Sequence, residues 1–406
     1  MKFRSILTFA GQRYRPWYGL LVTALLCASI TPAMAMQSRF CPPLPSPKAA
    51  QKSVHIASGD VSTLLETLRT ARRGTTLLLA DGIYTLAPNQ SLEVSKPGVT
   101  IRGASGRRAA VIIEGGDNTI SINADDVTVA DITLRNPTFH AIQVRGEVGL
   151  VRPTIYNVHL VDAGQQFVKV STGDGSLGKF ADAGLVACSL IEYTTYARGT
   201  DSTPPSYTNG VDILAGKDWV IRDNIFRRIR SQAGPAGPAV LAWKNAMNTL
   251  IQRNLILDSW RGIALGLSAP DALSRGGAHV VYDHQDGLVE NNVILALHKP
   301  ADAAIENNYA FNSRIINNIV YYNEEINHVV KWSIEYRFIP TKALIKGNNT
   351  NFPVIKRDPY PEKESIIKNN TIHTGGDWFI GIIKGNLNFI DIKIFLSEAD
   401  TDVSTR

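Results

Sequence analysis

The sequence is poor in cysteine, with only Cys27, Cys41 and Cys188 among its 406 residues. No cluster of cysteine and histidine has the spacing of a structural zinc site, which excludes a fold held together by zinc. A Gly-rich phosphate loop, a nucleophile elbow and a cofactor motif are also missing, so we expect no organic cofactor. The intervals between its aliphatic segments lack sustained helical periodicity, which argues against an alternating α/β fold.

A large net charge is also missing once the first residues are set aside. Residues 1–35 hold four basic and no acidic residues, then an apolar stretch and Ala33-Met34-Ala35, the pattern of a secretory signal peptide. The whole chain has 42 basic and 36 acidic residues. Removal of residues 1–35 leaves 42 − 4 = 38 basic and 36 acidic residues, a formal net charge of +2. A nearly neutral chain gives no reason to expect nucleic-acid binding.

The signal peptide predicts a secreted or periplasmic protein with no stable membrane insertion after cleavage. An uncleaved membrane anchor is the alternative, but the apolar stretch from Leu20 to Ile30 is short for a span. In an exported protein Cys41 and Cys188 can pair, which would pin residues 36–52, a Pro-rich stretch that we interpret as a linker. A free, buried Cys188 is equally compatible with the sequence.

What the sequence does contain is a short phrase that returns at regular intervals. Two or three aliphatic residues precede an Asn or small residue and further aliphatics follow, as in Trp219–Phe226 and Gly287–Ile294. The turn residues lie roughly 22 to 38 positions apart, a spacing typical of stacked-repeat proteins. These turn residues are Gly103, Asp131, Asn157, Ser189, Asn224, Asn254, Asn292, Asn318, Asn348 and Asn370.

Each phrase is too short for a helix and too aliphatic for a loop, so it predicts two short strands around a bend. Asn suits the bend because it tolerates a left-handed backbone, and stacked Asn side chains can form amide ladders. We therefore predict an all-β protein, a single-stranded right-handed parallel β-helix of about ten coils over residues 53–376. A β-propeller fits less well, because each repeat has one Asn-centred bend and not a four-stranded blade.

Both ends of this stack of coils are expected to be covered. Residues 58–74 carry apolar residues at helical spacing and end at a glycine, so we predict a short amphipathic helix that caps the first coil. Its apolar positions are Val61, Leu64, Leu65 and Leu68. The repeat fades after about residue 375, and we interpret residues 377–406 as a C-terminal cap or tail of a protein that we expect to be a monomer.

The opening of the repeats resembles the start of pectate-lyase-like β-helix proteins. An x-G-x-Y segment, Asp81-Gly-Ile-Tyr84, precedes a G-V-T-I-x-G segment, Gly98-Val-Thr-Ile-Arg-Gly103. Together with the Asn-centred phrases, the resemblance covers roughly residues 58–375. It implies the fold more than the activity, since this superfamily contains lyases, glycoside hydrolases, epimerases and structural proteins.

Alignment of the phrases also aligns the strands that precede them. Because side chains alternate along a strand, one set is expected to face inward: Ile142, Val168, Val211, Ile305 and Ile334. The residues beside them then face outward on one sheet: Gln143, Lys169, Asp212, Glu306 and Glu335, with Arg145 and Arg337 two positions further along. This mixed-charge surface is either a solvated face or a saccharide groove.

In a saccharide groove each of these groups has an expected role. Ca²⁺ prefers carboxylate oxygens, and the candidate ligands are Asp212, Glu306 and Glu335. Arginine pairs with the carboxylate of a uronic acid, and the candidate substrate-binding residues on this face are Gln143, Arg145 and Arg337. Three longer intervals are expected to project as loops that wall the groove: residues 171–182, 195–207 and 268–286.

A second group of candidates follows in residues 238–261. Trp243 is a stacking platform if it faces outward and a core residue if it faces inward. Lys244 follows at the strand end, and Arg261 opens the next coil, a layout similar to alginate-lyase and chondroitinase-B-type β-helix lyases. The resemblance implies a Lys as base and an Arg one coil later as acid, although the position of that Arg reads Ile263–Leu267 here.

The chemistry of a lyase sets requirements on these residues. A base removes the C5 proton of a uronic acid, a cation neutralises its carboxylate, and a donor assists departure of the C4 oxygen. A lysine acts as base only if its pKa falls, so Lys169 and Lys244 are candidates beside Arg261 or Ca²⁺. C5 epimerisation would share the first step and return the proton on the opposite face.

A hydrolase would need two carboxylates placed across the scissile bond. The paired-Asp and Gly-His-Gly signatures of polygalacturonase-like β-helices are absent, and the isolated histidines are expected to be structural or at the surface: His140, His284 and His328. The sequence therefore favours an exported β-helix that acts on an anionic polysaccharide by β-elimination or C5 epimerisation. The alternative is a non-catalytic β-helix that binds glycans or is a structural part of the cell envelope.

Overall fold

The computed structural model describes residues 41–45, 52–323, 333–336, 342–356 and 365–373. The chain divides into a unit of residues 43–390 and a second unit of residues 1–42 and 391–406, and the fold is that of the first. The expected signal peptide, the segment 377–406 and Arg337 lie outside the described residues. No helix within the described ranges is long and apolar enough to span a membrane.

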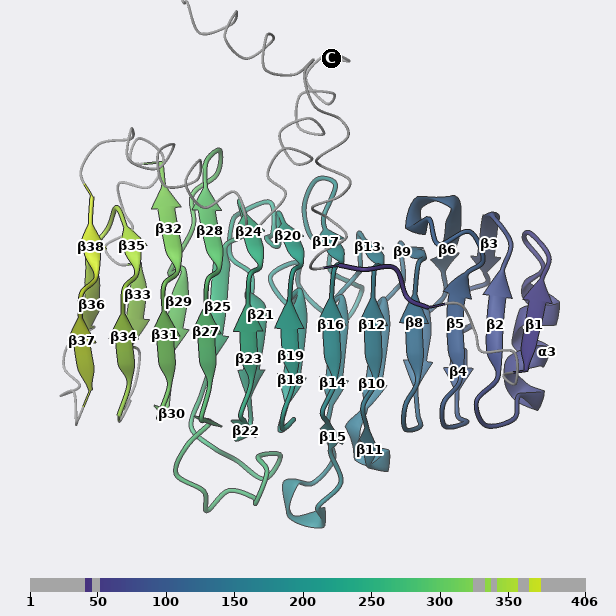
Figure 1. Ribbon diagram of the computed structural model, residues 1–406, viewed down its shortest axis with the longest axis horizontal. Helices are drawn as coiled ribbons and strands as arrows, with labels where there is room; N and C mark the ends of the chain where they lie inside the picture. The colour runs from purple at the N-terminus through teal and green to yellow at the C-terminus, as the bar shows by residue number, and fades with distance from the viewer. Residues whose placement is uncertain (1–40, 46–51, 324–332, 337–341, 357–364, 374–406) are drawn as a thin grey trace, which may run out of the picture. The chain divides into compact units, whose positions relative to one another are not determined.

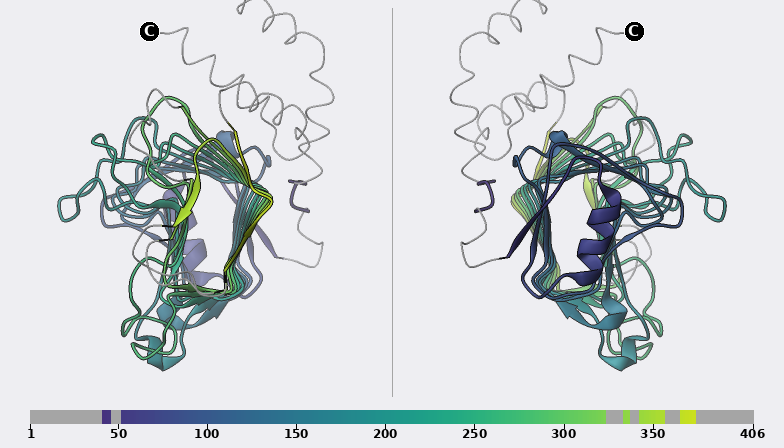
Figure 2. Two further views of the ribbon diagram at one scale, coloured as in Figure 1. Left: turned by 90° about the vertical axis from the view of Figure 1, so that its left-hand side faces the viewer. Right: turned by 90° about the vertical axis from the view of Figure 1, so that its right-hand side faces the viewer.

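Three parallel β-sheets, here named sheets A, B and C, enclose one continuous hydrophobic core (Figures 1 and 2). The chain visits sheet A, then sheet B, then sheet C in each coil, and each coil pairs in parallel with the next. Parallel strands joined through such crossovers are right-handed. The predicted right-handed parallel β-helix is confirmed, and the ten described strands of sheet C agree with about ten coils.

Sheet A contains twelve strands in the described residues. In spatial order they are β1 (Ser53–Ile56), β2 (Thr76–Leu79), β5 (Thr100–Gly103), β8 (Thr128–Ala130), β12 (Thr154–Tyr156), β16 (Leu185–Ala187), β19 (Val220–Arg222), β23 (Leu250–Gln252), β27 (Leu288–Glu290), β31 (Arg314–Ile316), β34 (Leu344–Lys346) and β37 (Ile366–Lys368).

Sheet B contains eleven strands in the same described ranges. They are β3 (Gly82–Leu86), β6 (Val111–Gly115), β9 (Thr133–Arg135), β13 (His159–Val161), β17 (Leu190–Glu192), β20 (Ile225–Arg227), β24 (Leu255–Leu257), β28 (Val293–Ala296), β32 (Ile319–Tyr322), β35 (Asn349–Thr350) and β38 (Thr371–Ile372).

Sheet C completes each coil. Its described strands are β4 (Leu92–Val94), β7 (Ile120–Ile122), β10 (Ile142–Arg145), β14 (Val168–Ser171), β18 (Val211–Leu214), β21 (Pro238–Trp243), β25 (Arg261–Leu265), β29 (Ile305–Asn307), β33 (Ile334–Tyr336) and β36 (Val354–Lys356). Between sheets C and A lie two small ladders, β11 (Leu150–Val151) with β15 (Ala181–Asp182), and β22 (Ala246–Met247) with β26 (His284–Gln285) and β30 (Ala310–Phe311).

Alternation along each strand builds the core. In sheet C the predicted inward residues are in register and buried, from Ile142 through Val168 and Val211 to Ile305 and Ile334. Each coil contributes a few aliphatic side chains to a stack that only neighbouring coils can cover. The 3₁₀ turns η1 (Arg108–Ala110), η2 (Gly146–Val148) and η3 (Gly175–Leu177) lie in the connections between strands.

The predicted capping helix is present as α3 (Val61–Thr70). Asp60 is its N-cap and accepts a hydrogen bond from the backbone N–H of Thr63 at 2.9 Å. Leu64 and Leu68 are buried in the core, and α3 lies across the end of the first coils (Figure 2, right). The helix therefore covers apolar surface that a bare first coil would expose.

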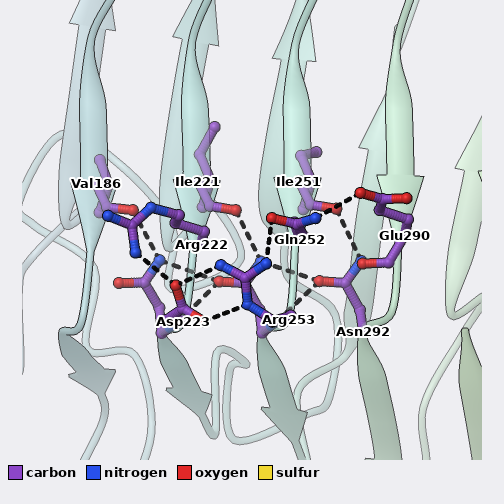
Figure 3. A network of polar contacts seen from close by, with 11 residues as sticks. Val186, Ile221, Arg222, Asp223, Ile251, Gln252, Arg253, Glu290 and Asn292 are labelled. Carbon is purple, nitrogen blue, oxygen red and sulfur yellow. Dashed lines mark hydrogen bonds and ion pairs between the residues drawn. The ribbon is translucent and has the colours of Figure 1, made fainter. Parts of the chain in front are cut away.

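An asparagine ladder runs along the bend between sheets A and B (Figure 3). The side-chain amide of Asn254 donates to the carbonyl of Ile221 at 2.9 Å and to Oδ1 of Asn292 at 2.9 Å. The same two bonds recur at each of the other rungs, which are Asn224, Asn292, Asn318 and Asn348. The predicted amide ladder is confirmed, and it satisfies buried carbonyls that the bend leaves unpaired.

The left-handed residue of the bend is one position earlier than predicted. Asp223, Arg253 and Asn291 have positive φ, whereas the ladder residues that follow them do not. In the first coils Asp131 and Asn157 occupy this left-handed position and not the ladder position. The predicted turn residues therefore mix two adjacent positions, because both favour small polar side chains for different reasons.

The two cysteines left open by the sequence are both oxidised. Cys41 and Cys188 are each disulfide-bonded. Cys188 itself adopts the left-handed position of its bend, with φ of 59°. This redox state is the one that an exported protein permits.

Candidate functional site

The outer face of sheet C carries the row of residues that the sequence predicted. Gln143 pairs with Lys169, and Lys169 pairs with Asp212. Two apolar residues follow, Leu241 and Ala264, before Glu306 and Glu335 continue the row. The charged positions thus form two groups, separated by about 14 Å because three strand spacings of roughly 4.8 Å lie between Asp212 and Glu306.

Lys169, Asp212 and Trp243 form a connected polar group in the first of these regions. The ammonium of Lys169 donates to Oδ2 of Asp212 at 2.5 Å, and Nε1 of Trp243 donates to Oδ1 at 2.8 Å. Both oxygens of a nearly buried carboxylate are therefore engaged. Trp243 faces outward and remains partly exposed, which is the orientation of a stacking platform.

The electrostatic environment of Lys169 favours its charged form. Burial by itself would lower the pKa of the Lys169 ammonium, but the charges of Asp212 and Tyr207 and the bond to Asp212 outweigh it. The pKa is therefore raised, in the direction opposite to that required of a general base. In this arrangement Lys169 is a cation next to the cleft.

Arg261 and Glu306 form the second charged group. Nε of Arg261 lies 2.7 Å from Oε1 of Glu306, an ion pair whose geometry is not that of a directed hydrogen bond. Asp302 lies 3.7 Å from the same nitrogen, and Asn308 donates to Oε2 of Glu306 at 2.9 Å. Arg261 pairs in the ladder with Pro238, so it begins its strand and does not occupy the outward row.

The carboxylates proposed as Ca²⁺ ligands are not brought together as one set. Glu306 and Glu335 are neighbours in the ladder, but Asp212 lies three strands away. Within the described residues no three His, Cys, Asp or Glu side chains are grouped closely enough to hold a metal. The oxygens of Asp212 are already bonded to Lys169 and Trp243, so this donor set does not fit a calcium ion.

Lys244 lies at the rim of the same region, as its place after β21 predicts. Its ammonium forms an ion pair with Asp271 and lies 4.4 Å from the centre of the Trp243 ring. Its backbone N–H donates to Oδ1 of Asp283 at 2.8 Å, which anchors the loop that contains Asp271. Burial raises the pKa of the Asp283 carboxyl despite three backbone hydrogen bonds.

Gln143 and Arg145 lie at the other end of the row and are linked through Ser171 and Glu147. Gln143 accepts a hydrogen bond from Asn118 at 2.8 Å, and Arg145 is ion-paired with Glu147 at 2.9 Å. Glu147 also accepts a hydrogen bond from Ser171, the next outward residue of β14 after Lys169. These two predicted substrate-binding residues therefore lie on the same face as Lys169 but outside the cleft.

A cleft of about 310 Å³ opens over the middle of the row. Its floor includes Asp212, Leu241, Trp243 and Arg261 from three adjacent strands. Two connections between sheets B and C form one wall, and Leu267 on the opposite side begins the long connection to sheet A. The wall residues are Ser206, Tyr207, Thr208, Pro235, Ala236 and Gly237.

The predicted loops divide between the two sides of sheet C. Residues 195–207 end at Tyr207 and wall the cleft, as expected. Residues 171–182 and 268–286 pack against each other on the other side, where Gly175 donates to the carbonyl of Ala272 at 2.8 Å. Arg275 joins them further, since it lies over the ring of Phe180 and is ion-paired with Asp182.

Several residues of the cleft escaped the sequence analysis. Gln166 is almost fully buried against the cleft, and its Oε1 has no hydrogen-bond partner among the described residues. Asp271, the partner of Lys244, belongs to a loop with no periodic pattern. Tyr207 was detectable only as the end of a predicted wall loop, because no repeat position marks it.

The geometry of fold and site defines the class of protein. A chain of three parallel sheets with an asparagine ladder along one bend and a cleft on one sheet is a right-handed parallel β-helix protein. No family model matches the sequence, and no curated protein matches it significantly.

Several solved structures are similar to this chain at low sequence identity, and the first of them supports the fold. An alginate lyase from Paenibacillus sp. str. FPU-7 has a TM-score of 0.50 and 13% identity over 79% of this chain and 99% of that chain. Pectate lyase Pel9A has a TM-score of 0.48 and 12% identity over 79% and 80% of the two chains. A polygalacturonase from Erwinia carotovora ssp. carotovora has a TM-score of 0.44 and 13% identity over 82% and 99%. The chain spans 62% and 61% of the length of two further alginate lyases.

Proposed function

We propose that this protein binds an anionic polysaccharide along the outer face of sheet C and acts on its uronic acid units by β-elimination or C5 epimerisation. The observation that supports the proposal is the cleft in which Asp212, ion-paired with Lys169, and Arg261, ion-paired with Glu306, lie beside an outward tryptophan. A flat face with solvated charges would have favoured a scaffold. The proposal includes export to the periplasm or medium and a monomeric state.

Each residue in or beside the cleft has a separate proposed role in binding or catalysis. Trp243 offers a ring face on which a sugar can stack, and its N–H keeps Asp212 oriented toward Lys169. The cations Lys169 and Arg261 are placed to neutralise the carboxylate of a bound uronic acid, which lowers the barrier to loss of the C5 proton. Each cation must exchange part of its ion pair for the substrate carboxylate.

The role of base falls to Lys244 more readily than to Lys169, because Lys169 is held protonated. Lys244 lies over the Trp243 ring, and its partner Asp271 is 47% exposed on a loop, so the pair can open when a substrate enters. A neutral Lys244 would take the C5 proton, and elimination would break the C4–O bond and leave an unsaturated uronate. The departing C4 oxygen would take a proton from the resulting Lys244 ammonium or from water. Epimerisation would return a proton to the opposite face of C5.

Non-catalytic glycan binding is the second candidate, and a specific observation favours it. Lys169, Lys244 and Arg261 are each ion-paired with a carboxylate in the unliganded protein. A binding module needs the stacking platform and the cations but no group free to act as base. The two candidates differ in whether the polymer is altered.

The deciding experiment combines binding and turnover on a panel of uronate polymers: alginate, pectate and glycosaminoglycans. New unsaturated ends report elimination, and exchange of the C5 proton with deuterated solvent reports epimerisation. We expect turnover that Lys244→Ala abolishes, whereas Lys217→Ala, a substitution of an exposed lysine between sheets C and A, leaves it unchanged. An EDTA arm tests whether Ca²⁺ contributes.

Binding that is lost in Trp243→Ala without any turnover would support the non-catalytic candidate. Absence of both binding and turnover on the whole panel would overturn the proposal. Cleavage after Ala35 and recovery outside the cytoplasm test export, and light scattering after size exclusion tests the monomer.

A further inference from the structure

The side-chain amide of Gln166 is a polar group of the cleft to which the proposed chemistry gives no role. Gln166 lies two positions before β14 and lines the cleft together with Asp212 and Trp243. It is 1% exposed, and its Oε1 is buried without a hydrogen-bond partner among the described residues. A buried acceptor that stays unpaired is costly, so native proteins rarely keep one without a reason.

The backbone around Gln166 is fixed, which holds the amide at the cleft. The Nδ1–H of His140 donates to the carbonyl of Gln166 at 3.2 Å, because a carbonyl can only accept. The next residue, Phe167, donates its N–H to the carbonyl of Asn209 at 3.0 Å, and its ring lies 4.8 Å from that of Tyr193. The last torsion of a glutamine side chain is broad. A rotation about it therefore turns Oε1 towards a ligand without any movement of the strand.

The nearest side-chain donors of the cleft are engaged elsewhere. The hydroxyl of Thr208 donates to the carbonyl of Gln165 at 2.8 Å. Asn209, one coil further along the same corner, donates through Nδ2 to the carbonyl of Pro238 at 3.1 Å. Neither residue can satisfy the Gln166 amide unless it gives up a bond that it already makes.

The wall of the cleft at residues 235–238 is apolar and supplies few donors. Two of its four residues are prolines, which have no backbone N–H. The N–H of Gly237 is already donated to the carbonyl of Thr208 at 2.9 Å. Apolar surroundings lower the local dielectric constant, which makes an unpaired polar group more costly. A donor on a bound ligand is therefore the complement that the Gln166 amide fits.

We propose that Gln166 is a specificity-determining residue that selects a sugar unit with a free hydroxyl at this place in the cleft. The inference rests on the function proposed above and narrows its substrate class to unesterified uronate polymers. The hydroxyl of an unmodified sugar donates to Oε1, whereas an acetyl ester of the same oxygen has no proton to donate. The ester would leave Oε1 unpaired and would also push its methyl group against the amide. Sites that accept a hydrogen bond from a substrate hydroxyl discriminate strongly against analogues that lack it.

The test compares uronate oligomers in two forms, O-acetylated and the same oligomers after alkaline removal of the esters, prepared from alginate and from pectate. Isothermal titration measures the affinity of each form. We expect the wild type to bind the de-esterified form of its preferred polymer at least about 100-fold more tightly than the acetylated form. Gln166→Leu, which keeps a similar shape but has no acceptor, should bind the two forms nearly equally.

Two further measurements separate this role from a structural one. Gln166→Leu should not lower the free energy of unfolding in urea, because the amide has no described partner to lose. The matched control is Gln252→Leu on the outer face of sheet A, where the amide is already bonded to Glu290 and Arg253. This control should keep the discrimination of the wild type.

Several outcomes would overturn the inference. Equal affinity of the wild type for both forms would do so, needs no variant, and would leave the proposed function standing. Discrimination that persists in Gln166→Leu, or a clear loss of stability in that variant, would show that the amide has another role. Binding of neither form of either polymer would also overturn it, and the wider panel of polymers then decides the proposed function separately.

Discussion

Single residues in the cleft depend strongly on their charged partners. Lys169 and Asp212 have side chains that are 13% and 3% exposed, so each charge relies on the other for its solvation. Removing one partner of a buried pair leaves an uncompensated charge, which costs more than the pair contributes in total. The ammonium of Lys169 is therefore expected to be as much a structural group as a ligand for the substrate.

Asp212→Asn should lower the free energy of unfolding by about 3 to 5 kcal/mol at neutral pH, because it strands the charge of Lys169. The double variant Lys169→Met, Asp212→Asn should recover most of the loss, since no buried charge remains. Chemical denaturation of the two variants measures both values. A single variant as stable as the wild type would contradict the buried pair.

The pH dependence of this difference follows from the raised pKa of Lys169. A lysine whose pKa is raised by folding stabilises the protein fully below its unfolded pKa, near 10.5, and the stabilisation is lost as pH rises through the folded pKa. The gap between wild type and Asp212→Asn should therefore close above about pH 10.5. Denaturation at pH 8 and at pH 11 tests this.

Two buried histidines make the protein less stable at acid pH, whereas Lys169 makes it less stable at alkaline pH. Burial lowers the pKa of His140 and of His284 to about 3 in each case. His284 donates or accepts one hydrogen bond with Thr249 at 3.0 Å and sits wholly inside the coil. Below pH 6.5 these two histidines are protonated in the unfolded chain but stay neutral in the folded protein. The free energy of unfolding therefore falls as the pH falls.

His284→Gln should flatten the acid branch of the stability profile. Each buried histidine is expected to remove about 1.4 kcal/mol of stability per pH unit between roughly pH 6.5 and 3. The substitution removes one such slope, whereas His279→Gln, at an exposed side chain, should leave the slope due to His284 unchanged. Equal slopes in the wild type and His284→Gln would show that the His284 ring is not buried in its neutral form.

At the bend between sheets A and B, the sequence repeat located the Asn ladder correctly but not the left-handed residue beside it. Its Asn residues were found from the sequence because the same side chain recurs at one position of many coils. The left-handed residue before each Asn was assigned one position late, because Asp, Arg and Asn alternate there. A backbone requirement that several residue types can meet leaves a weaker pattern than an amide ladder that only Asn satisfies.

Asn254→Ala should destabilise the protein by about 3 kcal/mol, since it removes two donated bonds and two accepted bonds in a buried ladder. Asn248→Gly is the control, because Asn248 is exposed, bonds only Asp218 among the described side chains, and has a left-handed backbone (φ of 53°) that glycine adopts without strain. We expect the control to change stability by less than about 0.5 kcal/mol. Urea unfolding compares the two variants, and equal effects would show that the ladder has no special stabilising role.

In the candidate site, the residues on the strands of sheet C could be predicted from the sequence, whereas those on the loops could not. Their register placed Lys169 beside Asp212, and Glu306 beside Glu335, as the alignment of the repeats predicted. The partner of Lys244 was not predictable, because Asp271 belongs to a long loop whose conformation has no periodic signature. Loop residues such as Tyr207 reach the cleft through tertiary packing alone.

The solenoid as a whole needs closed ends, because each coil covers only its neighbours. At the N-terminal end α3 supplies this cover, with Leu64 and Leu68 turned into the core. Leu64→Ala should cost about 2 to 5 kcal/mol and raise light scattering on heating, since it opens a cavity under the cap. Leu65→Ala, at a partly exposed position of the same helix, should cost clearly less.

The sequence alone determined the architecture of this protein. Aliphatic phrases repeated around a polar bend can only be buried by stacking, so the parallel coils, the capping helix and the outward row of sheet C were all predictable from local patterns. Only the tertiary structure decided which charges meet, that Lys169 is held as a cation, and where the cleft lies on sheet C. Those outcomes depend on burial and on through-space neighbours contributed by irregular loops, and such neighbours leave no periodic pattern along the chain.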